Sequence, residues 1–152
     1  PASVAFSAGA NVVNVLEFVL PFKITITYFR WNQSVSTAGS ANVAIYDSSG
    51  TLVVQGSGED DLTAPGVGIQ NFTCASTTLN PGVYYWAWAS STTPEMASGF
   101  SINSTWNNIM QTPILRGTAA NVLSGTTMPA TLSTITALTG AGITPIIYAS
   151  NN

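Results

Sequence analysis

The chain has 152 residues, and only 6% of them are charged, against about a quarter in an ordinary soluble domain. Its three basic side chains cannot form the patch that neutralises phosphates, so we expect no nucleic-acid partner. No apolar run approaches the roughly 18 residues that span a bilayer, so we expect no membrane insertion. A hydrophobic fraction of 45% excludes a disordered chain, and the length predicts a single domain over residues 1–152.

The low charge is the most unusual property of this sequence. Hydroxyl and amide groups must supply the solubility that Lys, Arg, Asp and Glu normally give. This composition is typical of a surface packed against copies of itself or against a larger assembly. A small neutral extracellular domain is the alternative.

The residues that most often perform catalysis are missing or isolated. There is no histidine, which removes the commonest general base and metal ligand. The single cysteine, Cys74, allows no intrachain disulfide and is interpreted as a small buried hydrophobic residue. No sequence motif supports a catalytic serine activated by Lys23. We expect a protein that is not an enzyme, with a glycosidase using paired carboxylates as the remaining enzymatic alternative.

The first thirty residues predict a succession of strands. Residues 1–10 predict a short leading strand or an N-terminal arm. Residues 11–20 fit a helical stripe as well as a strand, but their β-branched side chains favour the strand. Residues 22–31 alternate as a half-buried strand does. One face is expected to carry Phe22, Ile24, Ile26 and Tyr28, and the other Lys23, Thr25, Thr27 and Phe29.

Residues 41–55 predict a β-hairpin. Asp47 can accept hydrogen bonds from the backbone of its own turn, and Gly50 suits the positive φ that such a turn requires. A long loop over 56–68 and a short strand over 69–74 are expected to follow.

The stretch LNPGVYYWAWAS, residues 79–90, predicts a central strand after the turn Asn80-Pro81-Gly82. Tyr84, Trp86 and Trp88 point to one face, and smaller residues occupy most of the other. This asymmetry suits a sheet that packs its large face into a core and lets a second layer approach the small face.

The remaining segments predict weaker elements. We expect a loop over 91–99, strands over 100–106 and 109–115, an irregular stretch over 116–133, a weak strand over 135–138 and a closing strand over 143–149. Together these are eight to ten short strands without a convincing helix. That pattern predicts an all-β, antiparallel β-sandwich of jelly-roll-like type. The uncharged residues 117–138, including Ala130 and Thr134, are assigned to a subunit interface.

Two groups of polar or aromatic residues are candidate ligand sites. Glu59, Asp60 and Asp61 offer oxygen ligands to Ca²⁺, although EF-hand spacing is absent and a solvated loop is the alternative. Trp106, Asn107 and Asn108 combine a ring that can stack on a sugar with two amides that can hydrogen-bond it. Trp31, Trp86, Trp88 and Tyr84 are the further aromatic candidates, and a place in the core is favoured for Trp86 and Trp88. No other cofactor is expected.

The motifs VAIYDSSGTLV, residues 43–53, and LNPGVYYWAWA, residues 79–89, resemble those of phage appendage β-sandwiches at the ends of tail fibres and on heads or tails. The resemblance implies a non-enzymatic fibre or decoration domain of the virion. It implies a homo-oligomer, with a trimer as the first expectation, that contacts other virion proteins and a host-surface glycan. It transfers no binding residue. The same motifs look like those of some bacterial carbohydrate-binding sandwiches, so a secreted carbohydrate-binding module is the alternative, and the expected location is the virion or extracellular space.

Overall fold

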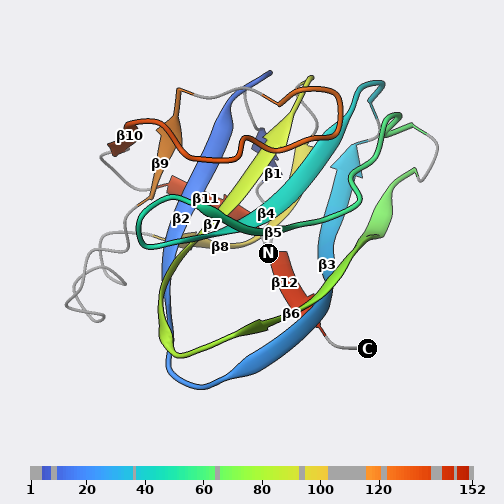
Figure 1. Ribbon diagram of the computed structural model, residues 1–152. Coiled ribbons are helices and arrows are strands. Elements are labelled where there is room, and N and C mark those ends of the chain that lie inside the picture. The colour runs from blue at the N-terminus through green and yellow to red at the C-terminus, as the bar shows by residue number, and fades with distance from the viewer. Residues whose placement is uncertain are drawn as a thin grey trace.

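The computed structural model describes residues 5–7, 10–35, 37–63, 66–92, 95–102, 116–120, 123–137, 142–145 and 147–150. None of these residues lies in a helix. The described part of the chain therefore contains no helix that is long and apolar enough to cross a membrane. The strands are β1 Ala5–Ser7, β2 Val13–Leu20, β3 Ile24–Val35, β4 Ala41–Asp47, β5 Leu52–Gln55, β6 Gly68–Leu79, β7 Gly82–Ser90, β8 Glu95–Ile102, β9 Arg116–Ala119, β10 Ile135–Ala137, β11 Gly142–Pro145 and β12 Ile147–Ser150 (Figure 1).

These strands form two six-stranded sheets in which every pairing is antiparallel. Sheet A has the order β1-β8-β3-β12, with β6 paired to β3 and β11 paired to β8. Sheet B has the order β10-β9-β2-β7-β4-β5. The all-β class and the antiparallel sandwich predicted from the sequence are confirmed. The jelly-roll-like connectivity stays a prediction.

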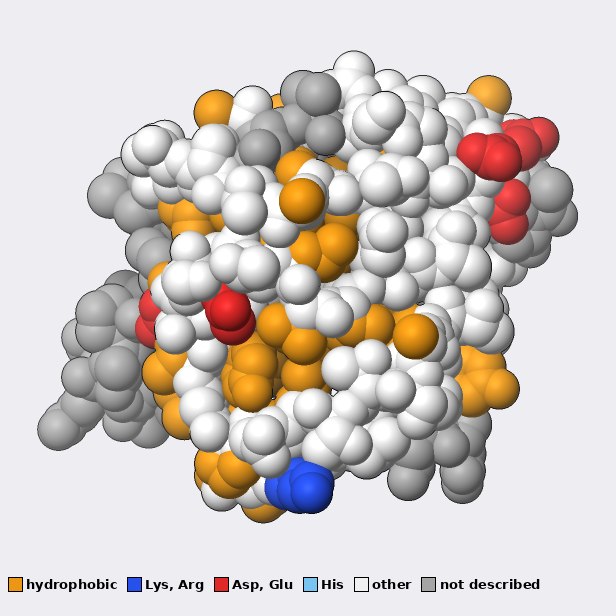
Figure 2. Space-filling model, viewed as in Figure 1, with side chains coloured by type: hydrophobic (Ala, Val, Ile, Leu, Met, Phe, Trp, Pro, Cys, Tyr) orange, Lys and Arg blue, Asp and Glu red, His pale blue; other side chains and the backbone are white. Residues whose placement is uncertain are grey.

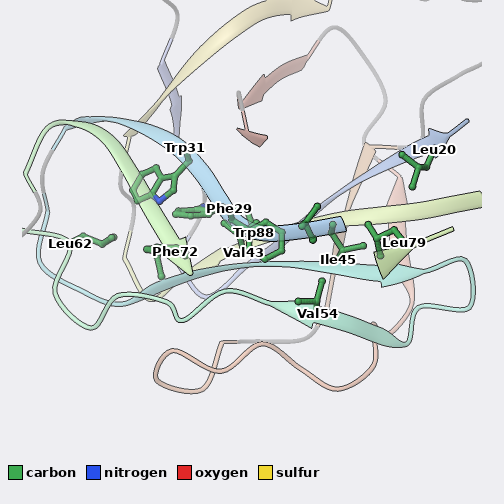
Figure 3. Packing of buried hydrophobic residues seen from close by; sticks show 12 residues of the cluster. Leu20, Phe29, Trp31, Val43, Ile45, Val54, Leu62, Phe72, Leu79 and Trp88 are labelled. Carbon is green, nitrogen blue, oxygen red and sulfur yellow. The ribbon is translucent and has the colours of Figure 1, made fainter. Parts of the chain in front are cut away.

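The inner core lies between the two sheets (Figure 3). Both sheets contribute large side chains that water does not reach, and burial of this apolar surface is the main favourable term in folding. Sheet A supplies Ile26, Phe29, Trp31, Phe72 and Leu79, sheet B supplies Leu20, Val43, Ile45, Val54 and Trp88, and the loop before β6 supplies Leu62.

The side-chain alternation expected over residues 22–31 is wrong beyond Ile26. The pairing of β3 with β6 shifts register between Ile26 and Tyr28, as it does at a β-bulge. Thr27 of β3 lies opposite three residues of β6 at this point, and beyond it the inward-facing positions of β3 change from even-numbered to odd-numbered residues. Phe29 is therefore buried in the core and Tyr28 is only half-buried. Phe22 precedes the strand and is exposed.

Several other sequence-based boundaries also need correction. Residues 13–20 form a strand, so the helical alternative for this region is wrong. Strand β8 begins at Glu95, inside the expected loop over 91–99, and β9 lies in the stretch expected to be irregular. The closing strand is divided into β11 and β12. The strand expected over 109–115 lies outside the described residues.

A second layer covers the outer face of sheet B. We call residues 123–132 the covering segment, which crosses over the sheet in Figure 1. The small face of β7, with Ala87 and Ala89, packs together with Leu123 and Met128 in a second buried cluster. That cluster also contains Val13, Val15, Ala44, Tyr46 and Ala119. The close approach of a second layer to the small face of β7 is thus confirmed, and the layer comes from the same chain.

Backbone hydrogen bonds hold the covering segment to the edge of sheet B. The Leu52 N–H donates to the Ala130 carbonyl at 2.9 Å, and the Leu132 N–H donates to the Gly50 carbonyl at 2.8 Å. The Tyr46 hydroxyl donates to the Pro129 carbonyl at 2.7 Å. The apolar groups of this segment therefore serve the chain's own core, which corrects their assignment to a subunit interface. Ala130 and Thr134 are exposed, and a role for them in an interface stays a prediction.

Candidate functional site

The partly buried rings of Phe18, Tyr84 and Trp86 form an aromatic row on the core side of sheet B. Phe18 on β2 lies directly opposite Tyr84 on β7, and their ring centroids are 5.8 Å apart in a stacked arrangement. Phe18 and Trp86 are separated by 5.7 Å, and Phe29 of sheet A meets Trp86 edge-on at 5.5 Å. The Tyr84 hydroxyl donates to the Asn80 carbonyl at 2.9 Å, which fixes the end of this ring beside the β6–β7 turn.

Trp31 and Trp88 face each other inside the core. Their ring centroids are 4.6 Å apart, and both side chains are buried. Neither ring is available to a sugar. The core position favoured for Trp88 is therefore confirmed, and Trp31 is a core residue and not part of a sugar-binding platform. Trp86 is only partly buried. The proposed sugar-binding residues Trp106, Asn107 and Asn108 lie outside the described residues.

The acidic loop, residues 59–61, turns its carboxylates toward nearby backbone amides. One oxygen of Glu59 accepts from the Asp60 N–H at 3.0 Å. Asp61 accepts from the Thr63 hydroxyl at 2.6 Å and from the Thr63 N–H at 3.0 Å, and these bonds hold the pKa of Asp61 below its usual value. Among the residues that the structure describes, no three His, Cys, Asp or Glu side chains are grouped as metal ligands. The Ca²⁺ site at Glu59, Asp60 and Asp61 stays a prediction.

Two side chains that could take part in chemistry are Cys74, which is half-buried rather than buried as expected, and Tyr46, which is buried. Burial raises the pKa of the Cys74 thiol, which lowers its thiolate fraction and hence its nucleophilicity. Burial also raises the pKa of the Tyr46 phenol, whose hydroxyl is engaged by the covering segment. Both environments suit packing better than reaction.

Exposed apolar side chains gather at one end of sheet B. Val19 is 67% exposed and Val83 is 40% exposed, and they lie directly opposite each other in the β2–β7 ladder. Phe22, in the turn that follows β2, is 63% exposed. We call Val19, Phe22 and Val83 the Val19 patch. The covering segment packs with Val13 and Val15 but leaves Val19, on the same face, in contact with solvent.

A second exposed apolar pair begins β6. Val67 is 66% exposed and Ile69 is 62% exposed, and we call these two residues the Ile69 patch. Leu62, which follows the acidic loop, approaches the opposite, buried face of the same pair of strands. The Gln33 side-chain amide donates to the Leu62 carbonyl at 2.9 Å, and Gln33 is the ladder partner of Gly68, which lies between Val67 and Ile69.

One face of the molecule carries few charged side chains (Figure 2). Figure 2 shows a face dominated by uncharged polar groups, with apolar side chains gathered near its middle and only scattered acidic and basic groups. Exposed apolar patches on such a surface are typical of protein-protein contact sites.

Sequence reasoning missed the exposure of Val19 and Val83 and the place of Phe18 in the aromatic row. Residues 11–20 are apolar on both faces of the strand, so their pattern does not say which end is left uncovered. Their placement follows from strand register, which joins residues more than sixty positions apart. Searches of protein-family models, curated proteins and solved structures gave no match to the chain.

Proposed function

We propose that this chain is a non-enzymatic structural domain of a phage virion, of the fibre or decoration type. The observation that carries the proposal is the pair of exposed apolar patches on a chain with only 6% charged residues. Val19, Phe22, Val67 and Ile69 each leave more than 60% of their surface in water, although the domain has a well-filled core. Burial of such side chains by another molecule is favourable by about 25 cal/mol per Å² of apolar surface removed from water, which favours binding of a partner protein.

The proposed role is assembly with copies of this chain and with other virion proteins, and contact with a host-surface glycan. The absence of histidine from the whole sequence and the raised pKa of Cys74 support a protein without catalytic activity. A virion location accounts for the low charge, because a surface covered by neighbouring subunits needs no charged groups for solubility.

The test is the presence of the chain in purified particles. Quantitative mass spectrometry of particles banded by density should find the chain at a fixed copy number, and antibody labelling should place it at one site on the particle. A chain recovered only from the particle-free fraction would refute the virion assignment.

A secreted carbohydrate-binding module is the second candidate, favoured by the partly exposed aromatic row. Tyr84 and Trp86 present part of their ring surface, and aromatic rings stack on the apolar faces of sugars. Glycan-array binding that Tyr84→Ala abolishes would support this candidate. Tyr85→Ala is the matched control, because Tyr85 is the same residue type on the opposite face of β7.

A further inference from the structure

The covering segment takes no part in the inner core. Only two of its side chains, Leu123 and Met128, are buried, and both belong to the second cluster on the outer face of sheet B. The inner core between the two sheets includes no residue of the segment. Removal of the segment from sheet B would therefore leave the contacts between the two sheets in place.

Hydrogen bonds to one edge of sheet B supply much of the attachment. Besides the three bonds already described, the Asn42 side-chain amide donates to the Thr126 carbonyl at 2.6 Å. The Met128 N–H donates to the side-chain carbonyl of Gln55 at 2.8 Å. All the partners of the segment in these five bonds lie on β4, on β5 or in the turn between them. Each bond contributes little net stability, because water replaces the lost partner when the bond opens.

The two ends of the covering segment lead to the opposite edge of sheet B. The segment lies between β9 and β10, which pair with each other. In the order β10-β9-β2-β7-β4-β5, three strands separate β9 from β5, which is a distance of roughly 19 Å. The segment spans this distance and crosses the sheet (Figure 1). It can therefore lift from β4 and β5 while β9 and β10 stay paired at the other edge.

We propose that the covering segment is a strap that opens as one unit, lifting from β4 and β5 while the two-sheet sandwich stays folded. Local openings of this kind have free energies below that of global unfolding. The open state uncovers backbone groups at the β5 edge beside the small side chains of Ala44, Ala87 and Ala89. An uncovered strand edge is the surface to which a further strand adds. This inference does not depend on the virion assignment.

Native-state hydrogen exchange, measured at increasing urea concentrations, tests the opening. The reporters are the N–H groups of Leu52, Met128 and Leu132, because each donates across the contact between the segment and sheet B. All three should exchange through one opening with a common free energy. Its urea dependence should be smaller than that of the slowest amides of β7, because lifting the segment exposes less surface than unfolding. Strand β7 has neighbours on both sides and reports global unfolding.

Two conservative variants separate opening from unfolding. Tyr46→Phe removes the bond to Pro129 and keeps the buried ring, so exchange at the three reporters should become roughly three- to tenfold faster. Ile26→Val weakens the inner core, which the open state retains. Exchange in β7 should therefore become roughly three- to tenfold faster, and exchange at the reporters should not change. Circular dichroism will verify that both variants fold.

Four results would overturn the inference. The first is exchange of the three reporters at unrelated free energies, and the second is a urea dependence equal to that of β7. The third is equal acceleration of the reporters and β7 by Ile26→Val, which would mean that the segment opens only when the domain unfolds. The fourth is unchanged reporter exchange in Tyr46→Phe. The first two are measured on the wild type, so the test does not depend on the folding of either variant.

Discussion

Replacing Gly50 by valine tests the β4–β5 turn together with its contact to the covering segment. Gly50 has φ of +82°, a conformation that β-branched residues avoid. Its N–H donates to the Asp47 carbonyl at 2.9 Å, and its carbonyl accepts from the Leu132 N–H at 2.8 Å. The residue therefore closes the hairpin and anchors the covering segment at the same point.

The expected destabilisation has two parts. Holding valine at this φ costs about 1–3 kcal/mol. A Cβ at position 50 would lie 3.4 Å from the Leu132 Cβ, with the Leu132 carbonyl oxygen at 3.7 Å, so a Cβ alone fits and we expect the two further methyl groups of valine to press against the covering segment. Overpacking of this kind costs about 1–3 kcal/mol. The sum of about 2–6 kcal/mol corresponds, in a domain of this size, to a fall in Tm of roughly 4–24 °C.

The assay is thermal unfolding by calorimetry, with Gly125→Val as the matched control. Gly125 also has positive φ, at +59°, but a Cβ there meets nothing within 4 Å, so only the backbone cost applies. We expect the wild type to be the most stable and Gly50→Val the least stable of the three. A Gly50→Val protein that melts with the wild type, or no lower than Gly125→Val, would refute the contact between this turn and the covering segment.

Three further predictions concern buried or hydrogen-bonded groups. Met128→Ala should destabilise the domain by about 2–4 kcal/mol in urea unfolding, because the Met128 side chain is buried between the covering segment and sheet B, whereas the exposed Ala130→Ser should have little effect. The Ser49 hydroxyl and the Thr51 N–H lower the pKa of Asp47 below 3.8, so the stability from this carboxylate is present above that pH and lost as pH falls through the lowered pKa. Asp47→Ala should therefore narrow the difference in Tm between neutral and acidic solution, and an undiminished difference would contradict this role. The Cys74 thiol, whose pKa burial raises, should react with a disulfide reagent more slowly in the native protein than in urea, and equal rates would contradict its burial.

Local chemistry in the sequence was sufficient to predict the fold class and two elements, the β4–β5 turn and strand β7. The β4–β5 turn was predictable because Asp47 and Gly50 act on their own backbone: Asp47 accepts from Ser49 at 2.9 Å, and Gly50 adopts positive φ. Strand β7 was predictable with its unequal faces because side chains alternate along any strand. The absence of histidine and the scarcity of charge likewise required no coordinates.

Contacts between distant segments decided the rest. The register shift between β3 and β6 is a property of the pair of strands, so the alternation within residues 22–31 could not reveal that Phe29 turns inward. The covering segment has no periodic pattern because it is held by hydrogen bonds to the edge of sheet B and by a few side chains such as Met128. The Val19 patch exists because Val19 meets Val83 across the ladder and the covering segment stops short of both. Composition and propensity act over a few residues, whereas register and coverage are set by the packing of the whole chain.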